Sequence, residues 1–130
     1  MARVLVMDDD ENVRDILRRM LGRKGYEVLL AGNGDEGIRI FHQQLAGGQP
    51  VDLVVTDILM PEKEGLETIL ELRQEFPEVK IIVISGGGSL GEPGNILHAA
   101  RKLGARYSFR KPIPRDELLA AVEELIGPAS

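Results

Sequence analysis

Polar side chains that could do chemistry stand at the ends of four short apolar segments of this chain. They are carboxylates, a hydroxyl and an amine: Asp8, Asp9, Asp10, Asp57, Ser85 and Lys111. If the apolar segments are parallel strands, their carboxyl ends meet at one edge of a sheet, which is where open α/β sheets bind ligands. These side chains, far apart along the chain, would then form one site.

Carboxylates that converge in this way repel one another and raise one another's pKa unless a cation lies between them. Oxygen ligands suit a hard ion such as Mg2+, which uses one or two protein carboxylates and keeps several waters. The chain has no Cys, and no His follows any of the four segments. This argues against Zn2+ or Cu2+ and favours Mg2+.

Asp57 could act as a nucleophile at such a site. An ionised carboxylate can attack phosphorus and form an acyl phosphate. Phosphoryl transfer mainly requires positioning and neutralisation of charge. The cation, the Ser85 hydroxyl and the Lys111 ammonium would supply both at the phosphoryl oxygens.

Five short segments are predicted to be strands: 3–7, 27–31, 53–56, 80–84 and 107–110. Several have no polar alternation, as expected for strands that are buried on both faces. Apolar residues at three-and-four spacing predict a helix between each pair and one after the last. The residues of these apolar stripes are Val13, Ile16, Leu17, Met20 and Leu21, then Ile38, Phe41 and Leu45, then Leu66, Ile69 and Leu70, then Ile96, Ala99, Ala100 and Leu103, and finally Leu118, Leu119, Val122 and Ile126.

The ends of these helices carry their own signals. The first helix is expected over about 11–24, Asn33 is a candidate N-cap for the second, and Gly104 is expected to end the fourth. Pro114 resembles a proline at the first position of the last helix. Five alternating strand–helix units predict an α/β fold with a doubly wound parallel sheet, since a closed barrel needs roughly 250 residues.

Length and composition restrict the class of protein. The 130 residues suit one domain, so we expect a single domain over 1–130 with no output domain. Acidic residues outnumber basic ones by 21 to 16, which argues against nucleic acid or an anionic membrane as the partner. No apolar run approaches the roughly 20 residues of a membrane span, and the N-terminus does not resemble a signal peptide. We therefore expect a cytoplasmic protein without membrane insertion.

Four segments together resemble the receiver domain of two-component response regulators, and the resemblance covers essentially the whole chain. They are VLVMDDD (4–10), DLVVTDILMP (52–61, with Gly65 at the usual offset), IIVISG (81–86) and Lys111-Pro112. The resemblance implies a flavodoxin-like (βα)5 fold with strand order 2-1-3-4-5. The chain resembles the stand-alone, chemotaxis-regulator-like type of this family.

The resemblance also implies a role for each site residue. Asp57 would accept a phosphoryl group from a histidine kinase, a phosphotransfer protein or a small phosphodonor. Asp9 would ligate Mg2+ directly and Asp8 largely through water, with Asp57 and the backbone carbonyl of Leu59 as further ligands. Ser85 and Lys111 would hold the phosphoryl group, and the bond to Pro112 would be cis.

Such a chain is a signalling switch and not an enzyme with a diffusible substrate, although it would catalyse its own phosphorylation and dephosphorylation. The expected output is a contact with a downstream protein effector, made through the face of the last two strand–helix units by a monomer or weak dimer. His42 and His98 lie within helical patterns and not in a donor motif, so the chain is expected to be the acceptor.

Two features depart from the family pattern. The position of the family's aromatic switch residue falls on Ser108, and we expect the flanking Tyr107 and Phe109 to pack in or beside the sheet. The stretch from Ser85 to Lys111 is about four residues longer than usual because of a glycine-rich loop at 86–95. We expect this loop to bring altered dynamics or an unusual partner.

Three other interpretations stay open at this point. Residues 86–91 fit the GxGxxG pattern of dinucleotide sites, but no helix opens directly after them. Asp8 and Asp10 form a D-x-D of the haloacid-dehalogenase phosphatase type, with Ser85 and Lys111 as its later motifs. Its later acidic pair would be Asp116 and Glu117, but these are expected at the start of a helix and not at a strand end. A third interpretation is an interaction module that is never phosphorylated. Asp10 and Glu11 are also explained simply by a helix N-terminus, where negative charge is favourable.

Overall fold

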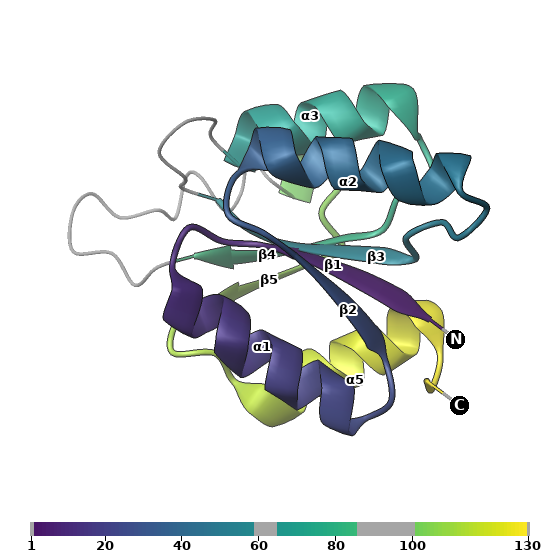
Figure 1. The fold of residues 1–130 in the computed structure, drawn as a ribbon. Helices are drawn as coiled ribbons and strands as arrows, with labels where there is room; N and C mark the ends of the chain where they lie inside the picture. The colour runs from purple at the N-terminus through teal and green to yellow at the C-terminus, as the bar shows by residue number, and fades with distance from the viewer. Residues whose placement is uncertain (1, 59–64, 86–100, 130) are drawn as a thin grey trace.

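Five parallel strands form the centre of the molecule (Figure 1). The computed structural model describes residues 2–58, 65–85 and 101–129. The strands are β1 (Arg3–Met7), β2 (Glu27–Ala31), β3 (Leu53–Asp57), β4 (Ile81–Ser85) and β5 (Tyr107–Arg110). The helices of the described residues are α1 (Glu11–Arg23), α2 (Gly34–Ala46), α3 (Gly65–Glu75) and α5 (Arg115–Ile126).

The order of the strands across the sheet is β2-β1-β3-β4-β5, and every neighbouring pair is parallel. This confirms the predicted flavodoxin-like fold and its strand order. The central strands β1, β3 and β4 are buried almost throughout, as their unbroken apolar sequences indicate, while the edge strands β2 and β5 are only partly buried.

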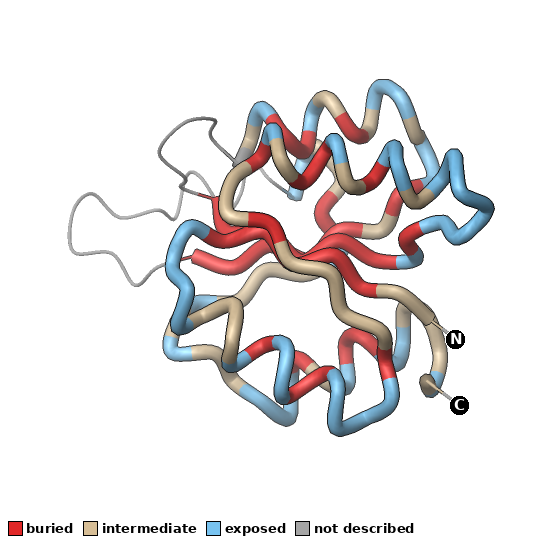
Figure 2. The backbone as a smooth tube through the Cα atoms, viewed as in Figure 1, coloured by how far each residue is buried: buried red, intermediate tan, exposed pale blue. Residues whose placement is uncertain are grey.

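Two layers of helices cover the sheet, with α1 and α5 on one face and α2 and α3 on the other (Figure 1). The alternation of side chains along β1 shows how one strand serves both layers. Val4 and Val6 pack with residues of α1 and α5, whereas Leu5 and Met7 pack with residues of α2 and α3. Buried residues accordingly fill the central strands and the inward side of each helix (Figure 2).

Polar side chains cap two of the helices. The Asn33 side chain accepts a hydrogen bond from the Glu36 amide at 2.8 Å, which confirms the predicted cap of α2. Asp10 does the same for α1 by accepting from the Asn12 amide at 2.8 Å. Pro114 is itself the N-cap of α5, so its prediction as the first helical residue was wrong by one position. No helix of the described residues is both long and apolar enough to cross a membrane.

The predicted apolar stripes were too wide in three helices. Ile16, Leu45 and Leu70 have 51%, 46% and 44% of their surface exposed, although their spacing placed them with the core residues. In α3 it is Leu72, fully buried, that packs inward together with Ile69. The reason is geometric, because a helix that lies on a flat sheet buries a narrower arc than one surrounded by other helices.

Strands β3 and β4 end one residue later than predicted, at Asp57 and Ser85. Both side chains therefore project from ordered strand ends and not from the connections that follow. The fourth predicted helix and the glycine-rich loop lie mainly within 86–100, outside the described residues. Residues 101–102 are helical, and Gly104 (φ 119°) follows them in a turn, as predicted.

Candidate functional site

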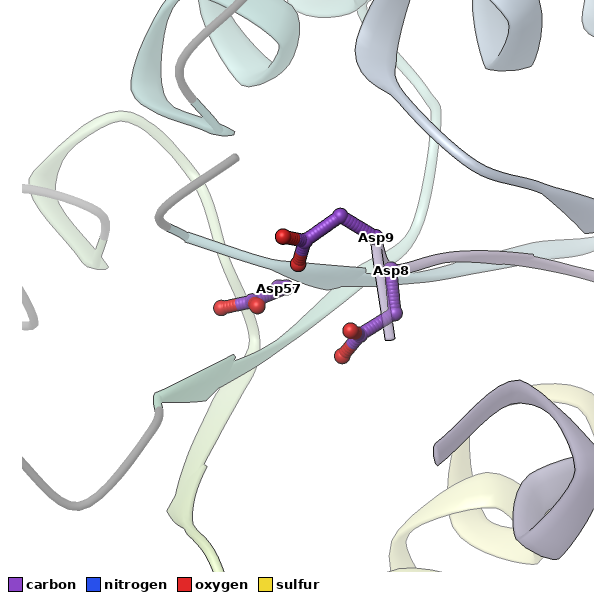
Figure 3. Close-up of side chains that lie close together, drawn as sticks. All are labelled: Asp8, Asp9 and Asp57. Carbon is purple, nitrogen blue, oxygen red and sulfur yellow. The ribbon is translucent and has the colours of Figure 1, made fainter. Parts of the chain in front are cut away.

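Three carboxylates converge where β1 and β3 end (Figure 3). Asp8 and Asp9 follow β1, and Asp57 is the last residue of β3. The strands are neighbours, with Met7 paired to Thr56 in the register, so their carboxyl ends lie side by side. One carboxylate oxygen from each aspartate lies within 4.8 Å of the others. The structure thus brings together three of the four acidic residues that the sequence placed at strand ends.

The environment of Asp8 is unfavourable for negative charge. Asp8 is 1% exposed and Asp57 is 5% exposed, while Asp9 is open to solvent. Burial raises the pKa of the Asp8 carboxyl above its usual value, even though Oδ1 accepts a hydrogen bond from the Asp10 amide at 2.8 Å and Lys111 lies close by. The charge of Asp9 acts in the same direction as burial. The Asp10 amide and Lys111 therefore compensate only part of the cost of a negative charge on Asp8.

Lys111 reaches into the cluster from the residue after β5. Its Nζ lies 3.0 Å from Asp8 Oδ2 and 3.4 Å from Asp57 Oδ2. Burial by itself would lower the pKa of Lys111, but the hydrogen bonds and charges of the two carboxylates outweigh burial and raise it above its usual value. The ammonium is therefore charged throughout the neutral pH range. The bond from Lys111 to Pro112 is cis, as the resemblance implied.

Ser85 ends β4 and is fully buried. Its Oγ has no hydrogen-bond partner among the described residues, whereas its carbonyl oxygen accepts from the Lys111 amide at 2.8 Å. Its neighbour Ile84 pairs with Asp57 in the sheet register. Buried hydroxyls without a partner are uncommon in folded proteins. Together these features mark Ser85 Oγ as a donor available to a group bound at this edge.

The donor set fits a hard divalent cation. All candidate ligand atoms are carboxylate oxygens, and the Lys111 ammonium lies beside two of the three carboxylates, those of Asp8 and Asp57. Mg2+ prefers such ligands and needs only one or two from the protein. Leu59, whose backbone carbonyl was expected to be a further ligand, lies outside the described residues.

Asp10 does not belong to the converging carboxylates. Its side chain is exposed and caps α1, which is the structural explanation considered for it from the sequence. Asp116 and Glu117 lie in the first turn of α5, where acidic residues are favourable for the helix itself. These placements give no support to a phosphatase that pairs Asp8 with Asp10. The GxGxxG stretch at 86–91 lies outside the described residues.

The aromatic residues of β5 pack beside the sheet, as predicted. The rings of Tyr107 and Phe109 are parallel, with centroids 6.2 Å apart, and both lie against the core shared with α1 and α5. Ser108 lies between them along the strand and therefore faces the other side of the sheet. His42, on α2, hydrogen-bonds Glu75 of α3 at 2.9 Å, while His98 lies outside the described residues.

Arg14 contacts the turn of the acidic cluster, although no pattern in the sequence pointed to it. This residue of α1 donates a hydrogen bond from Nη1 to the backbone carbonyl oxygen of Asp8 at 2.7 Å. The only signal for it in the sequence is an arginine that follows the acidic strand end by six residues, which is about one turn into the next helix.

Comparison with known proteins agrees with the fold. The sequence pattern of the response regulator receiver domain matches residues 4–123. The transcriptional regulatory protein AruR of Pseudomonas aeruginosa is 40% identical over 124 residues, which are 95% of this chain and 49% of that protein. The response regulator MprA of a Mycobacterium species (strain KMS) is 38% identical over 96% of this chain and 50% of its own length. The chain thus spans about half the length of the curated relatives it matches.

Solved structures extend the similarity to three dimensions. A response regulator receiver domain protein from Clostridium thermocellum superposes with a TM-score of 0.86 at 30% identity, covering 97% of this chain and 94% of that one. The response regulator protein TrrA from Thermotoga maritima, solved in complex with Mg2+-BeF, has a TM-score of 0.80 at 32% identity, covering 97% of this chain and 100% of that one.

Proposed function

The chain belongs to the response regulator receiver domain family, and from that premise we propose that Asp57 accepts a phosphoryl group from a histidine kinase or a phosphotransfer protein. One observation carries the proposal. The carboxylate of Asp57 ends β3 inside the acidic cluster and lies 3.4 Å from the Lys111 ammonium. A carboxylate nucleophile, a cluster able to hold a cation and a fixed positive charge are thus present in one place.

The transfer exchanges one bond to phosphorus for another. A carboxylate oxygen of Asp57 attacks the phosphorus of a phosphohistidine, the P–N bond breaks, and its electron pair leaves with the imidazole nitrogen of the donor. With acetyl phosphate as the donor, a P–O bond breaks and acetate leaves. In the later hydrolysis, a water molecule attacks phosphorus, the P–O bond to Asp57 breaks, its carboxylate is restored and inorganic phosphate departs.

We propose that Mg2+ is the cation that this chemistry requires. Asp9 and Asp57 would hold it directly, Asp8 through a water molecule, and the backbone carbonyl of Leu59 would be a further ligand. When bound, the cation supplies positive charge that offsets the charge on the phosphoryl oxygens. The converging carboxylates support this assignment, and so does the presence of Mg2+ in the solved TrrA structure, 32% identical to this chain.

Lys111 and Ser85 would hold the phosphoryl group once it is on Asp57. The ammonium of Lys111 already lies next to that carboxylate, and the Ser85 hydroxyl has no other partner among the described residues. The phosphoryl group adds roughly −1.5 to −2 charges at this position. It would draw both side chains toward it, and each is attached to a strand end, Ser85 to β4 and Lys111 to β5.

The output would be a change in protein–protein contacts. A shift in the population of two arrangements of β4, β5 and the segment between them would alter the face that these strands form with α5. The chain matches only about half of its curated relatives, so their activity as whole proteins is not transferred to it. We propose a downstream protein effector as the partner of this face.

The proposal is tested by incubating the protein with acetyl phosphate, with and without Mg2+, and recording its intact mass. The expected result is one phosphoryl adduct that requires Mg2+ and is released by hydroxylamine, as acyl phosphates are. Absence of an adduct at every donor concentration would favour an interaction module that is not phosphorylated. Steady release of phosphate without an adduct, surviving Asp57→Asn, would favour an Asp8/Asp10 phosphatase.

A further inference from the structure

The guanidinium of Arg14 extends from the beginning of α1 to the chain segment that carries the acidic cluster. Its Nη1 donates to the carbonyl oxygen of Asp8 at 2.7 Å, and the side chain is half-buried. Hydrogen bonds from a charged donor are roughly twice as strong as those between neutral groups. Arg14 is therefore firmly connected to the turn that follows β1.

The oxygen that accepts this hydrogen bond belongs to the peptide group joining Asp8 to Asp9. Because a peptide group is planar and rigid, fixing its oxygen also fixes the nitrogen of Asp9 and thus the start of that residue. Asp8 has further anchors, since its amide donates to Ala31 O at 3.1 Å and its carboxylate accepts from the Asp10 amide. Among the described residues, no hydrogen bond or ion pair holds the exposed Asp9 side chain.

The turn after β2 lies near the Arg14 guanidinium. In this turn the Gly32 amide donates to Glu36 Oε1 at 2.7 Å. A Cβ at Gly32 would lie 3.5 Å from Arg14 Nη1 and 3.6 Å from Glu36 Oε1, which are ordinary contact distances. The guanidinium thus lies near the turn after β2 as well as the turn after β1, close enough that an alanine side chain at position 32 would touch it.

We propose that Arg14 is a positioning residue for the Mg2+ site, acting through the Asp8–Asp9 peptide to aim the Asp9 carboxylate. This inference rests on the proposed function, since it assigns a supporting residue to the same site. A positioning role can be told apart from a simple charge effect, because the two change the affinity for Mg2+ in opposite directions. Loss of the hydrogen bond weakens cation binding by releasing Asp9, whereas mere loss of a positive charge near three carboxylates strengthens it.

The test is a Mg2+ titration of the unphosphorylated protein, followed by NMR through the backbone amides near the cluster. Arg14→Met keeps the length and apolar stem of the side chain but removes its donors. Groups that orient a metal ligand typically contribute 10- to 100-fold to metal affinity, so we expect the dissociation constant of Mg2+ to rise about tenfold. Arg14→Lys keeps a positively charged donor group at this position, and should restore the affinity for Mg2+ to within about threefold of wild type.

Arg18→Met is the matched control. Arg18 lies one turn further along α1, carries the same charge and bonds Asp15 at 2.6 Å instead of the backbone of Asp8. It should leave the Mg2+ affinity unchanged or slightly tighter. A positioning role is overturned if Arg14→Met binds Mg2+ as tightly as Arg18→Met does, while both variants keep the wild-type circular dichroism spectrum.

A failure of this inference is distinguishable from a failure of the proposed function. If wild-type protein binds Mg2+ through Asp9 and Asp57 and forms the adduct, but Arg14→Met does so equally well, only the role of Arg14 is wrong. If wild-type protein neither binds Mg2+ nor forms an adduct, the proposed function itself is wrong, and with it the inference about Arg14.

Discussion

The ammonium of Lys111 lies 3.0 Å from the buried carboxylate of Asp8, joining the residue after β5 to the residue after β1 across the width of the sheet. These strands are not neighbours, because β3 and β4 stand between them. The pair therefore passes the end of β3, and the same ammonium also lies beside the Asp57 carboxylate there. Each partner changes the pKa of the other, so the contribution of the pair can be measured through the pH dependence of stability.

Removal of the ammonium should destabilise the fold across the neutral pH range. Lys111→Met leaves the Asp8 and Asp57 carboxylates without this cation, and we expect a loss of about 1–3 kcal/mol in the free energy of unfolding. Because the folded-state pKa of Lys111 is raised, its contribution is fully present below its unfolded pKa of about 10.4 and declines as pH rises through the folded value.

Chemical denaturation at pH 7 and at pH values above 10 measures this contribution. Lys102→Met, which removes an exposed lysine, is the control and should cost little at either pH. A deficit of Lys111→Met that grows as pH rises above 10 would contradict the account.

Asp8→Asn should have the opposite effect on stability. Burial raises the folded-state pKa of Asp8, so wild-type protein loses stability as pH rises from about 3.8 through the folded value. Asparagine does not titrate, and its amide oxygen can still accept from the Asp10 amide. We expect the variant to melt a few degrees above wild type at pH 7 without added Mg2+, with a difference that shrinks toward pH 3.

A thermal melting series in buffers from pH 3 to 7 provides the comparison. A difference that widened as the pH fell would show that the Asp8 carboxylate is favourably placed in the folded state, contrary to the geometry described above.

Ser85→Ala should slow the phosphoryl chemistry without lowering the stability of the fold. The buried hydroxyl has no partner among the described residues, so its removal relieves a desolvation cost of about 1–3 kcal/mol or leaves stability unchanged. Formation and hydrolysis of the adduct should both become slower, because the phosphoryl group loses a donor. A lower melting temperature in Ser85→Ala would show that the hydroxyl is satisfied in the folded protein.

Gly37 is where α2 approaches the sheet too closely for any side chain. A Cβ there would lie 1.9 Å from Sδ of Met7, which is fully buried in β1. Gly37→Ala should therefore destabilise the protein by about 1–3 kcal/mol. Gly22→Ala, in α1 with nothing within 4 Å of the new Cβ, is the matched control and should stabilise by up to about 1 kcal/mol.

Equilibrium urea denaturation of both glycine variants measures the contrast. An equal response of Gly37→Ala and Gly22→Ala would mean that α2 can move away from β1 at no cost, and that the tight packing of Met7 does not fix the position of the helix.

The buried parallel strands and three members of the acidic cluster were predictable from strong local signals, whereas the order of the strands was implied only by the family resemblance. Apolar segments without alternation mark buried strands, and a polar residue at the end of a parallel strand lies at the edge where ligands bind. Asp8, Asp9 and Asp57 are such residues, and the structure brings them within 4.8 Å of one another.

Other features depend on how the elements pack and were not predictable. Ile16 and Leu70 fit the apolar period of their helices, yet they are exposed because only a narrow arc of each helix meets the sheet. Arg14 was missed because its contact is with a backbone oxygen of Asp8, whose direction depends on the course of the turn and not on residue spacing. Periodicity indicates which face of a helix is buried, but not which distant main-chain group a polar side chain reaches.

The central claim is that the phosphoryl group is carried by Asp57, and the most direct test is the intact mass of three proteins after treatment with acetyl phosphate and Mg2+. Wild type and Asp10→Asn should each carry one adduct, because the Asp10 side chain caps α1 and lies outside the cluster. Asp57→Asn should carry none. An adduct of equal yield on Asp57→Asn, or its loss in Asp10→Asn with the fold intact, would contradict the account.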